Sequence, residues 1–445
     1  MAPLARFRHP GQLVLAAFVG TIVVGTGLLM LPWSTASGTS PPLLDAAFTS
    51  TSAVCVTGLV TVDTGSYWSG FGQGVILVLI QVGGLGIMVV ATLLALAFAR
   101  RMGLRARFAL QTETRSTSPG QLRRLVLRIV AFSLVAEAVV AVLLGLRLWL
   151  GYDQTPGAAA YSGLFHAVSA FNNAGFSIYS DSLMGFVADP WFLLPVCAAV
   201  VLGGLGFPVV FELARSAWHP HSWSILTRIT VAMTVVLLVG GTVFFMFEEI
   251  NNPNTLQDKG LGTASLAAFA TSTMARTAGF NVLDIGAMDE ESLFATDVLM
   301  FIGGGSAGTA GGVKVTTIGL LAFVVWSEMR GRDDVEVGHR RVSAANQRQA
   351  LTVAVLGMSV VVVAAFGLLL LSDVAFNRVV FETVSAFGTV GLSTGLTPEL
   401  SDPAQALLAV VMLIGRVGPL TAATSLALRE RASRRRLPEE RMIVG

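Results

Sequence analysis

Long apolar runs alternate with short ones along this chain. Eight runs are long enough to cross about 30 Å of hydrocarbon as helices. They lie near 12–32, 71–99, 125–150, 191–214, 225–247, 294–326, 349–372 and 404–427. Inside each successive pair lies an apolar segment of about ten to twelve residues, near 44–54, 161–171, 263–274 and 378–387. Segments this short are typical of re-entrant helices. The pattern therefore predicts a unit of span, short helix and span that occurs four times.

The four units predict an all-α polytopic membrane protein, with eight transmembrane helices and four re-entrant pore helices around a central pore. Composition agrees, because 53% of the 445 residues are hydrophobic and only 13% are charged, which leaves too little polar surface for a soluble protein of this size. The predicted boundaries are 1–100, 101–215, 216–330 and 331–428 for the units and 429–445 for a cytoplasmic C-terminal tail.

One short motif recurs in every unit: a Phe, a Ser or Thr four residues later, and a Gly ten residues after the Phe. The four copies are Phe48/Ser52/Gly58, Phe165/Ser169/Gly175, Phe269/Thr273/Gly279 and Phe381/Ser385/Gly391. A fourfold repeat of a Gly loop inside the membrane can build a ring around an ion. Glycine permits the backbone angles of a carbonyl-lined loop and puts no side chain in the lumen. We expect the Ser or Thr to hydrogen-bond inside the short helix, in a structural role.

Basic residues are concentrated in alternate connecting segments. The segments 1–11, 100–128, 215–228, 330–348 and 429–441 hold 23 of the 29 Lys and Arg, which predicts that both termini are cytoplasmic. Each unit has two full spans, so all four Gly loops should enter from the outer side and face one another. The outer segments are acidic, which favours cations at the mouth, although solvated loops would look the same. Two Cys in apolar stretches imply no disulfide framework.

The third unit departs from the others. Residues 303–312 read Gly-Gly-Gly-Ser-Ala-Gly-Thr-Ala-Gly-Gly, and six glycines in ten residues should break the second span into a loop within the membrane. The run resembles two soluble motifs. It lacks the Gly-Lys-Ser/Thr of a nucleotide-binding loop, because Lys314 lies between two valines. It fits a nucleophile elbow at Ser306, but the only intramembrane His is His166, in a short helix, so we expect no enzyme.

The fourth unit carries an intramembrane arginine. Gly pairs occupy one place in the second spans of the first three units, and the fourth has Gly-Arg there: 83–84, 203–204, 303–304 and 415–416. A charge at this depth is costly. Arg416 either projects toward the axis as a cation barrier or gate anchor, or it snorkels toward the membrane surface or pairs with a carboxylate behind the helices.

Three other charged residues, in or next to apolar segments, are weaker candidates for a functional role. Glu137 is expected to make an interhelical hydrogen bond rather than relay protons. Arg276 is expected to cap its short helix from behind. Glu382 could tune the electric field at the fourth Gly loop or be structural.

These residues resemble the superfamily of Trk, Ktr and HKT potassium transporters over nearly the whole chain, and most closely the Ktr membrane subunit. The similar stretches are Ala-Val-Cys-Val-Thr-Gly-Leu (53–59), Ser-Ala-Phe-Asn-Asn-Ala-Gly-Phe (169–176), Arg-Thr-Ala-Gly-Phe-Asn (276–281), Gly-Thr-Val-Gly-Leu (388–392), Gly-Val-Lys-Val-Thr-Thr (312–317) and Ile-Gly-Arg-Val-Gly-Pro-Leu-Thr (414–421).

The resemblance implies an ion-selecting filter and an intramembrane gate at residues 303–313. The implied filter residues are Cys55, Val56, Thr57, Gly58, Asn172, Asn173, Ala174, Gly175, Arg276, Thr277, Ala278, Gly279, Gly388, Thr389, Val390 and Gly391. The implied gate residues are Gly303, Gly304, Gly305, Ser306, Gly308, Gly311, Gly312, Lys314 and Arg416. Gly in all four loops accompanies K⁺ selectivity in this family, whereas Ser in the first loop accompanies Na⁺ transport in some plant members.

The resemblance also implies K⁺ uptake across the cytoplasmic membrane, with Na⁺ as a candidate activator. The implied partners are a second copy of the chain, a cytosolic ring of nucleotide-binding regulatory subunits and membrane lipid, with no nucleic acid. The chain itself shows no nucleotide motif. Cys55 departs from the Thr or Ser expected there, which puts Na⁺ sensitivity in question. The alternative is a Na⁺-selective or Na⁺-coupled transporter of the same architecture.

Overall fold

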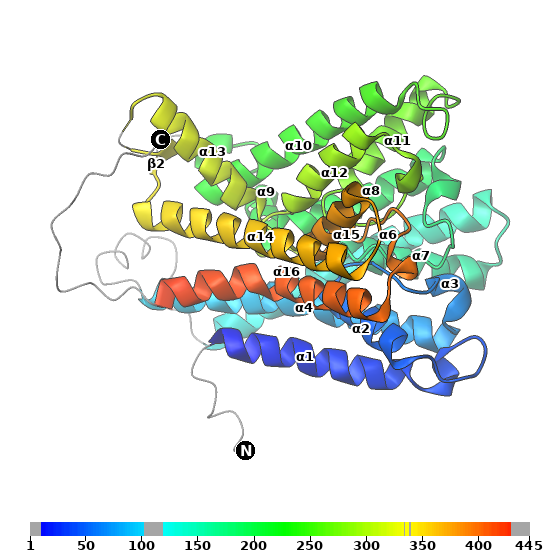
Figure 1. Ribbon diagram of the computed structural model, residues 1–445. Coiled ribbons are helices and arrows are strands. Elements are labelled where there is room, and N and C mark those ends of the chain that lie inside the picture. The colour runs from blue at the N-terminus through cyan, green and yellow to red at the C-terminus, as the bar shows by residue number, and fades with distance from the viewer. Residues whose placement is uncertain (1–9, 102–118, 333, 338–339, 429–445) are drawn as a thin grey trace, which may run out of the picture.

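The computed structural model describes residues 10–101, 119–332, 334–337 and 340–428. The predictions for residues 1–9, for most of the Arg-rich segment 100–128 and for the tail 429–445 lie outside these residues. The described chain is mostly helical, and its short helices fall within a few residues of the predicted positions. Figure 1 shows the long helices α14, α16 and α1 running side by side.

The first half of the chain forms two similar sets of helices, each with a short helix between two long ones. They are α1 (Pro10–Leu29), α2 (Leu43–Cys55), the one-turn α3 (Thr64–Tyr67), α4 (Gly70–Arg101), α6 (Pro119–Gly151), α7 (Pro156–Phe171), α8 (Pro190–Leu205) and α9 (Phe207–Ser216).

The second half repeats the arrangement. Its helices are α10 (Ile225–Glu249), α11 (Leu261–Met274), α12 (Glu290–Phe301), α13 (Val315–Met329), α14 (Ala344–Leu371), α15 (Phe376–Gly388) and α16 (Asp402–Leu428). Between α13 and α14 the strands β1 (Glu336–Val337) and β2 (Arg340–Arg341) pair antiparallel.

Local signals explain several helix starts. Thr155, Ser224 and Ser343 are N-caps whose hydroxyls accept hydrogen bonds from backbone N–H groups in the first turns of α7, α10 and α14. These side chains satisfy donors that a helix start leaves free. The pore helices α2, α7, α11 and α15 are buried over their C-terminal halves, where small and hydroxyl residues let the neighbouring helices approach.

The second span of the second unit is not the single helix that the sequence predicts over 191–214. It breaks between α8 and α9 with a bend of 103°. Gly206 at the break has φ +86°, and a Cβ there would lie 2.4 Å from the Ser306 carbonyl oxygen. Glycine is therefore required both for the backbone angle and for the close approach of another segment.

The second span of the third unit is broken as predicted. Helix α12 ends at Phe301 and α13 begins at Val315, and residues 302–314 between them are non-helical. The two ends of this segment stay together, because the Gly303 N–H donates to the Val313 carbonyl at 2.8 Å and the Val315 N–H donates to the Gly304 carbonyl at 3.0 Å.

Length and composition agree with a membrane protein. Among the described residues, three helices (Arg123–Gly151, Ile225–Glu249 and Ala344–Leu371) are long and apolar enough to span, and the bent pair α8 and α9 makes a fourth candidate. Shorter apolar helices include Val14–Leu29, Gly70–Gly86 and Val315–Met329. Side chains such as Val135, Val139 and Val142 on α6 are exposed, as lipid-facing positions would be.

Candidate functional site

Each pore helix ends in a loop with the same backbone conformation. In all four loops the motif glycine and the residue two positions before it have positive φ. The pairs are Val56 (57°) and Gly58 (95°), Asn173 (58°) and Gly175 (70°), Thr277 (75°) and Gly279 (70°), and Thr389 (49°) and Gly391 (98°). Non-glycine residues rarely adopt this region. Four copies of a rare conformation at one offset show that the sequence motif encodes one shared loop.

The four glycines form a closed ring. A Cβ on Gly58 would lie 2.4 Å from the Ala174 carbonyl oxygen, and one on Gly175 would lie 2.9 Å from that of Ala278. A Cβ on Gly279 would lie 2.1 Å from the Val390 oxygen, and one on Gly391 would lie 2.1 Å from the Thr57 oxygen. Each unit thus packs on the next in the order one, two, three, four and back to one. No side chain fits at any of the four positions without a shift of the neighbouring backbone.

Three of the four Ser or Thr side chains of the motif hydrogen-bond to the loop that follows their short helix, and not within the helix. Ser52 Oγ accepts from the Gly58 N–H at 3.0 Å, and Ser385 Oγ accepts from the Gly391 N–H at 3.1 Å. Ser169 Oγ donates to the Phe176 carbonyl, one residue beyond its glycine. Only Thr273 bonds inside its own helix, to Phe269. The prediction of a purely intrahelical role is therefore wrong for three of the four, because the chain folds back over the helix end.

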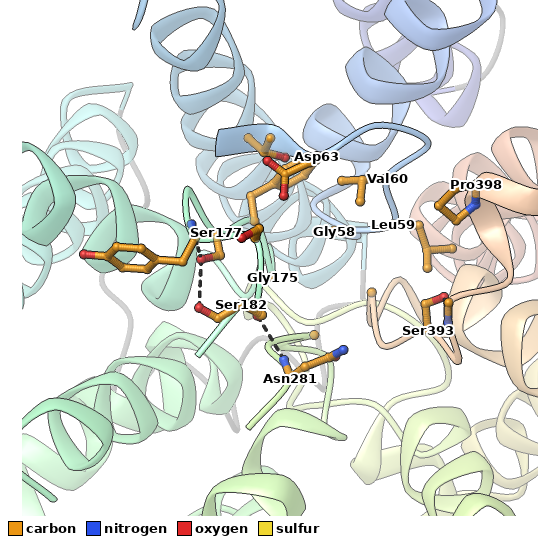
Figure 2. A pocket seen from close by; sticks show the side chains of 17 residues that line it. Gly58, Leu59, Val60, Asp63, Gly175, Ser177, Ser182, Asn281, Ser393 and Pro398 are labelled. Carbon is orange, nitrogen blue, oxygen red and sulfur yellow. Dashed lines mark hydrogen bonds between the residues drawn. The ribbon is translucent and has the colours of Figure 1, made fainter. Parts of the chain in front are cut away.

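A hollow of about 260 Å³ lies over the ring (Figure 2). All four glycines line it, together with residues that follow them in each loop, among them Leu59, Ser177, Asn281 and Ser393. Asp63 is the one carboxylate in this lining. The hollow therefore ends at the four glycines.

Two pore helices tie down the outgoing part of their loops with a titratable side chain at the same motif position, directly after the Phe. His166 Nε2 lies 3.0 Å from Ser177 Oγ, two residues beyond Gly175. Glu382 accepts hydrogen bonds from Ser393, the equivalent residue, and from the Thr394 N–H and the Thr397 hydroxyl. Both side chains are fully buried. The structural role predicted for Glu382 is thus confirmed, and an effect on the field at the ring stays a prediction.

Several residues of the predicted filter direct their side chains away from the ring. Asn172 Nδ2 donates to Glu137 Oε1 and to Gln81 Oε1, both at 3.0 Å, which confirms the interhelical hydrogen bond predicted for Glu137. The Arg276 guanidinium donates to the Thr234 carbonyl and hydroxyl on α10, and among the described residues no hydrogen bond joins it to its own short helix, so the predicted cap is not observed. Cys55 is buried in a hydrophobic cluster that also contains Phe48. The side chains of Asn172 and Arg276 are thus engaged with partners on other helices.

The glycine pairs of the second spans pack against the pore-helix ends. A Cβ on Gly83 would lie 2.0 Å from the Val54 carbonyl oxygen, and Cβ atoms on Gly203 and Gly415 would lie 1.9 Å from those of Phe171 and Phe387. These three carbonyls all belong to the residue four before the motif glycine. The third unit differs, because Gly303 lies instead against Gly311 of its own broken span.

The segment 303–313, which we call the intramembrane loop, crosses to other units. The Gly305 N–H donates to the Gly204 carbonyl and the Thr309 N–H to the Gly203 carbonyl, both in α8. Two cations hold three successive loop carbonyls: Arg416 donates to that of Thr309, and Lys314 to those of Ala310 and Gly311. Arg416 also reaches the Gly83 carbonyl at 3.5 Å. Among the described residues no carboxylate forms an ion pair with Arg416, so the pairing behind the helices is not observed.

The hydrolase alternative has no geometric support. Ser306 Oγ lies 2.8 Å from Thr316 Oγ1, whereas His166 binds the Ser162 carbonyl and Ser177. Both side chains are thus engaged with different partners, in different units.

Two features escaped the sequence analysis. One is the bend at Gly206, which the sequence Gly206-Phe207-Pro208 could have indicated, since Gly and Pro together mark breaks. The other is Thr309, one of two hydroxyl residues in the glycine-rich run. Its fully buried side chain bonds to Asn173, a contact across units that no local pattern encodes.

Comparison with known proteins identifies the family. The TrkH family, described as cation transport proteins, matches residues 4–434. The chain belongs to this family. It is 40% identical over 439 residues to the Ktr system potassium uptake protein B of Vibrio alginolyticus, covering 98% of this chain and 94% of that protein. It is 38% identical over 440 residues to the protein of the same name from Bacillus subtilis strain 168, covering 99% and 97%.

The fold agrees with a solved member. The crystal structure of the potassium transporter TrkH from Vibrio parahaemolyticus superposes with a TM-score of 0.72 at 20% identity, over 94% of this chain and 85% of that one. The resemblance to the Trk and Ktr proteins is confirmed, and so is the all-α polytopic architecture. A TrkH family chain is an ion transporter and not an enzyme, which agrees with the separate contacts of Ser306 and His166.

Proposed function

We propose that this protein is a K⁺ uptake pore of the cytoplasmic membrane, in which K⁺ sheds its water and passes through the ring of four glycine loops. The observation that carries the proposal is the closed ring itself, with four loops of one conformation under an open hollow. Backbone carbonyls in such a ring can replace the hydration shell of a cation. The C-terminal, partly negative ends of the pore helices lead directly into the four loops and favour a cation there. The membrane potential supplies about 2.3 kcal/mol per charge per 100 mV for inward movement.

K⁺ is the favoured ion. Gly58, Gly175, Gly279 and Gly391 leave all four loops without a side chain at the ring. The Cys55 side chain is fully buried in a hydrophobic cluster with Phe48 and Leu59, which favours a mild effect of its departure from the family pattern. Two full-length relatives are named as potassium uptake proteins, and a third, 34% identical and from Enterococcus hirae, is named as a potassium/sodium uptake protein. The Na⁺-selective alternative lacks a matching feature in this ring, and Na⁺ enters the proposal only as a candidate activator.

The intramembrane loop serves as the gate in this proposal. The loop, Lys314 and Arg416 would close the path on the far side of the ring from the hollow, with the two cations clamping three loop carbonyls. Flexible glycine-rich backbone at membrane depth persists where protein contacts or water satisfy it. A gate of this kind opens when the clamped carbonyls are released.

The remaining parts of the proposal concern assembly. We infer a homodimer in the cytoplasmic membrane with both termini inside, and a cytosolic ring of nucleotide-binding subunits that docks on the inner face. The support is the full-length likeness to proteins named as parts of a Ktr system and the basic inner segments 215–228 and 330–348. The division into four units at residues 100, 215, 330 and 428 follows the helix boundaries as part of the same proposal.

The test is cation flux into liposomes that contain the purified chain, comparing equal gradients of K⁺ and Na⁺. We expect K⁺ flux to exceed Na⁺ flux by about tenfold or more, which corresponds to about 1.4 kcal/mol between the ions. A chain that lacks residues 305–311 is measured in parallel, because the intact gate could be closed without the regulatory ring. Flux from the shortened chain but not from the intact one would support the gate. Equal K⁺ and Na⁺ flux, or no flux from either chain, would contradict the proposal.

A further inference from the structure

None of the residues two positions before the ring glycines lines the hollow, and two of them, Asn173 and Thr389, meet the intramembrane loop instead. Three of the four are polar and fully buried: Asn173, Thr277 and Thr389, with Val56 at the fourth place. Polar groups buried at membrane depth are stable only when they find partners. Asn173 and Thr277 have such partners, whereas the Thr389 hydroxyl has no hydrogen-bond partner among the described residues.

Asn173 takes its partners from two directions. Its Nδ2 donates to Thr277 Oγ1 of the neighbouring unit at 3.2 Å, and its Oδ1 accepts from Thr309 Oγ1 of the intramembrane loop at 2.9 Å. Thr309 is fully buried, and its Oγ1 also lies 3.3 Å from the Phe171 carbonyl oxygen at the end of α7. A continuous chain of hydrogen bonds thus runs from the intramembrane loop through the second ring loop to the third.

The intramembrane loop also touches the opposite side of the ring. A Cβ on Gly311 would lie 1.9 Å from Thr389 Oγ1, in the fourth unit. Because the ring closes in the order one, two, three, four, the second and fourth units face each other across it. The loop therefore runs beneath the ring from Asn173 on one side to Thr389 on the other. Contact on two opposite sides lets a movement of the loop change the ring itself.

Thr309 is also the residue whose carbonyl Arg416 binds. Its N–H donates to the Gly203 carbonyl at 3.1 Å, and its carbonyl accepts from Arg416. All its polar groups are engaged at once, so release of the loop by Arg416 would withdraw the hydroxyl from Asn173. Asn173 has φ 58°, in a region that Asn tolerates but does not prefer. Loss of its partner would free this part of the ring to relax.

We propose that Thr309 couples the intramembrane loop to the ring, so that the position of the loop sets the discrimination between K⁺ and Na⁺ as well as the amount of flux. Thr309 is a positioning residue, because it acts through Asn173 and Thr277 and not on the ion. This inference rests on the proposed K⁺ pore function. It differs from a simple barrier, which would pass or block both ions alike.

The test is the ratio of K⁺ to Na⁺ flux in liposomes for three variants. Thr309→Val keeps the shape and removes the hydroxyl, and we expect the ratio to fall by about fivefold, the factor that one neutral hydrogen bond contributes. Thr309→Ser keeps the hydroxyl and should restore the ratio. Thr316→Val is the matched control, because it removes the hydroxyl that meets Ser306 beside the same loop but contacts no ring residue in the described structure. It should change both fluxes by a common factor.

A second set of variants tests whether the hydrogen bonds from Thr309 through Asn173 to Thr277 act as a unit. The variants are Thr309→Val, Thr277→Val and the two combined. The double variant should lower the ratio of K⁺ to Na⁺ flux no more than the more damaging single variant does, because both substitutions interrupt the same series of hydrogen bonds. If Thr309→Val is not recovered as folded protein by size-exclusion chromatography, Thr309→Ala removes the same hydroxyl without adding volume and is read in its place.

Two results would overturn the coupling. One is that Thr309→Val changes K⁺ flux and Na⁺ flux by the same factor, so that their ratio is unchanged. The other is that the double variant lowers the ratio by the product of the two single-variant factors. A wild-type chain that carries K⁺ and Na⁺ equally would instead end the proposed function, so the two failures are distinguishable.

Discussion

The Arg416 guanidinium on α16 donates a hydrogen bond to the carbonyl oxygen of Thr309, 107 positions earlier in the chain. Lys314 holds the next two carbonyls, those of Ala310 and Gly311. The buried Arg416 and the partly buried Lys314 thus take the place of the helical hydrogen bonds that the glycine-rich run cannot form. The loop has a fixed position because other parts of the protein satisfy its carbonyls.

Removal of the arginine should open the pore. A hydrogen bond from a charged group contributes about 1.5–3 kcal/mol, so we expect Arg416→Ala to raise K⁺ flux by about tenfold. Arg416→Lys keeps the charge but cannot present two donors in one plane to Thr309 and Gly83. Its K⁺ flux should therefore lie between that of the wild-type chain and that of Arg416→Ala. Liposome flux measures both variants. Unchanged or lower flux in Arg416→Ala would exclude the clamp, and wild-type flux in Arg416→Lys would favour a purely electrostatic barrier.

Deletion of residues 305–311 should also raise flux. The deletion removes Thr309 and the clamped carbonyls. It leaves the hydrogen bonds between Gly303 and Val313 and between Gly304 and Val315, so the cut ends already lie side by side. The shortened chain should therefore fold, with a melting temperature in detergent close to that of the intact chain. Flux that stays the same or falls in a well-folded deletion variant would show that the loop is not the gate.

Substitution of a ring glycine should change ion preference. Gly58 has φ +95°, and its Cβ would meet the Ala174 carbonyl at 2.4 Å, so Gly58→Ser must displace the second loop. We expect the ratio of K⁺ to Na⁺ flux to fall by about tenfold or more, equivalent to about 1.4 kcal/mol. Gly395→Ala is the matched control, since φ is +81° there but no atom lies within 4 Å. A similar loss in the control would mean that backbone strain, and not ring contact, controls selectivity.

Loss of Glu382 should destabilise the protein. Glu382→Ala leaves the Ser393 and Thr397 hydroxyls and the Thr394 N–H without their acceptor in a buried site. We expect a loss on the order of 3 kcal/mol in the free energy of unfolding. Denaturation in detergent measures it, with the exposed Glu291→Ala as the control. An equal, small effect of both changes would show that the outer loop does not depend on Glu382.

The short helices and the ring glycines could be predicted from the sequence. One motif at one offset indicated all four of each, because they are local properties of helix ends and of residues that accept positive φ. The positive φ of the residue two positions before each glycine is seen only in the structure. The break near residues 303–313 followed from the helix cost of six glycines. The roles of Ser52, Ser169 and Ser385 were misjudged, because a hydroxyl near a helix end can bond either inside the helix or to the loop that folds back over it.

The sequence by itself determined the spans, the short helices, the ring glycines and the presence of a break, since hydrophobic length and backbone preference act over a few neighbouring residues. Only the tertiary structure decided which glycine meets which carbonyl, where the second unit bends at Gly206, and that Thr309, Asn173 and Arg416 come together. These contacts join residues more than a hundred positions apart. They depend on how four similar units close around one axis, a relation that no local pattern in the chain contains.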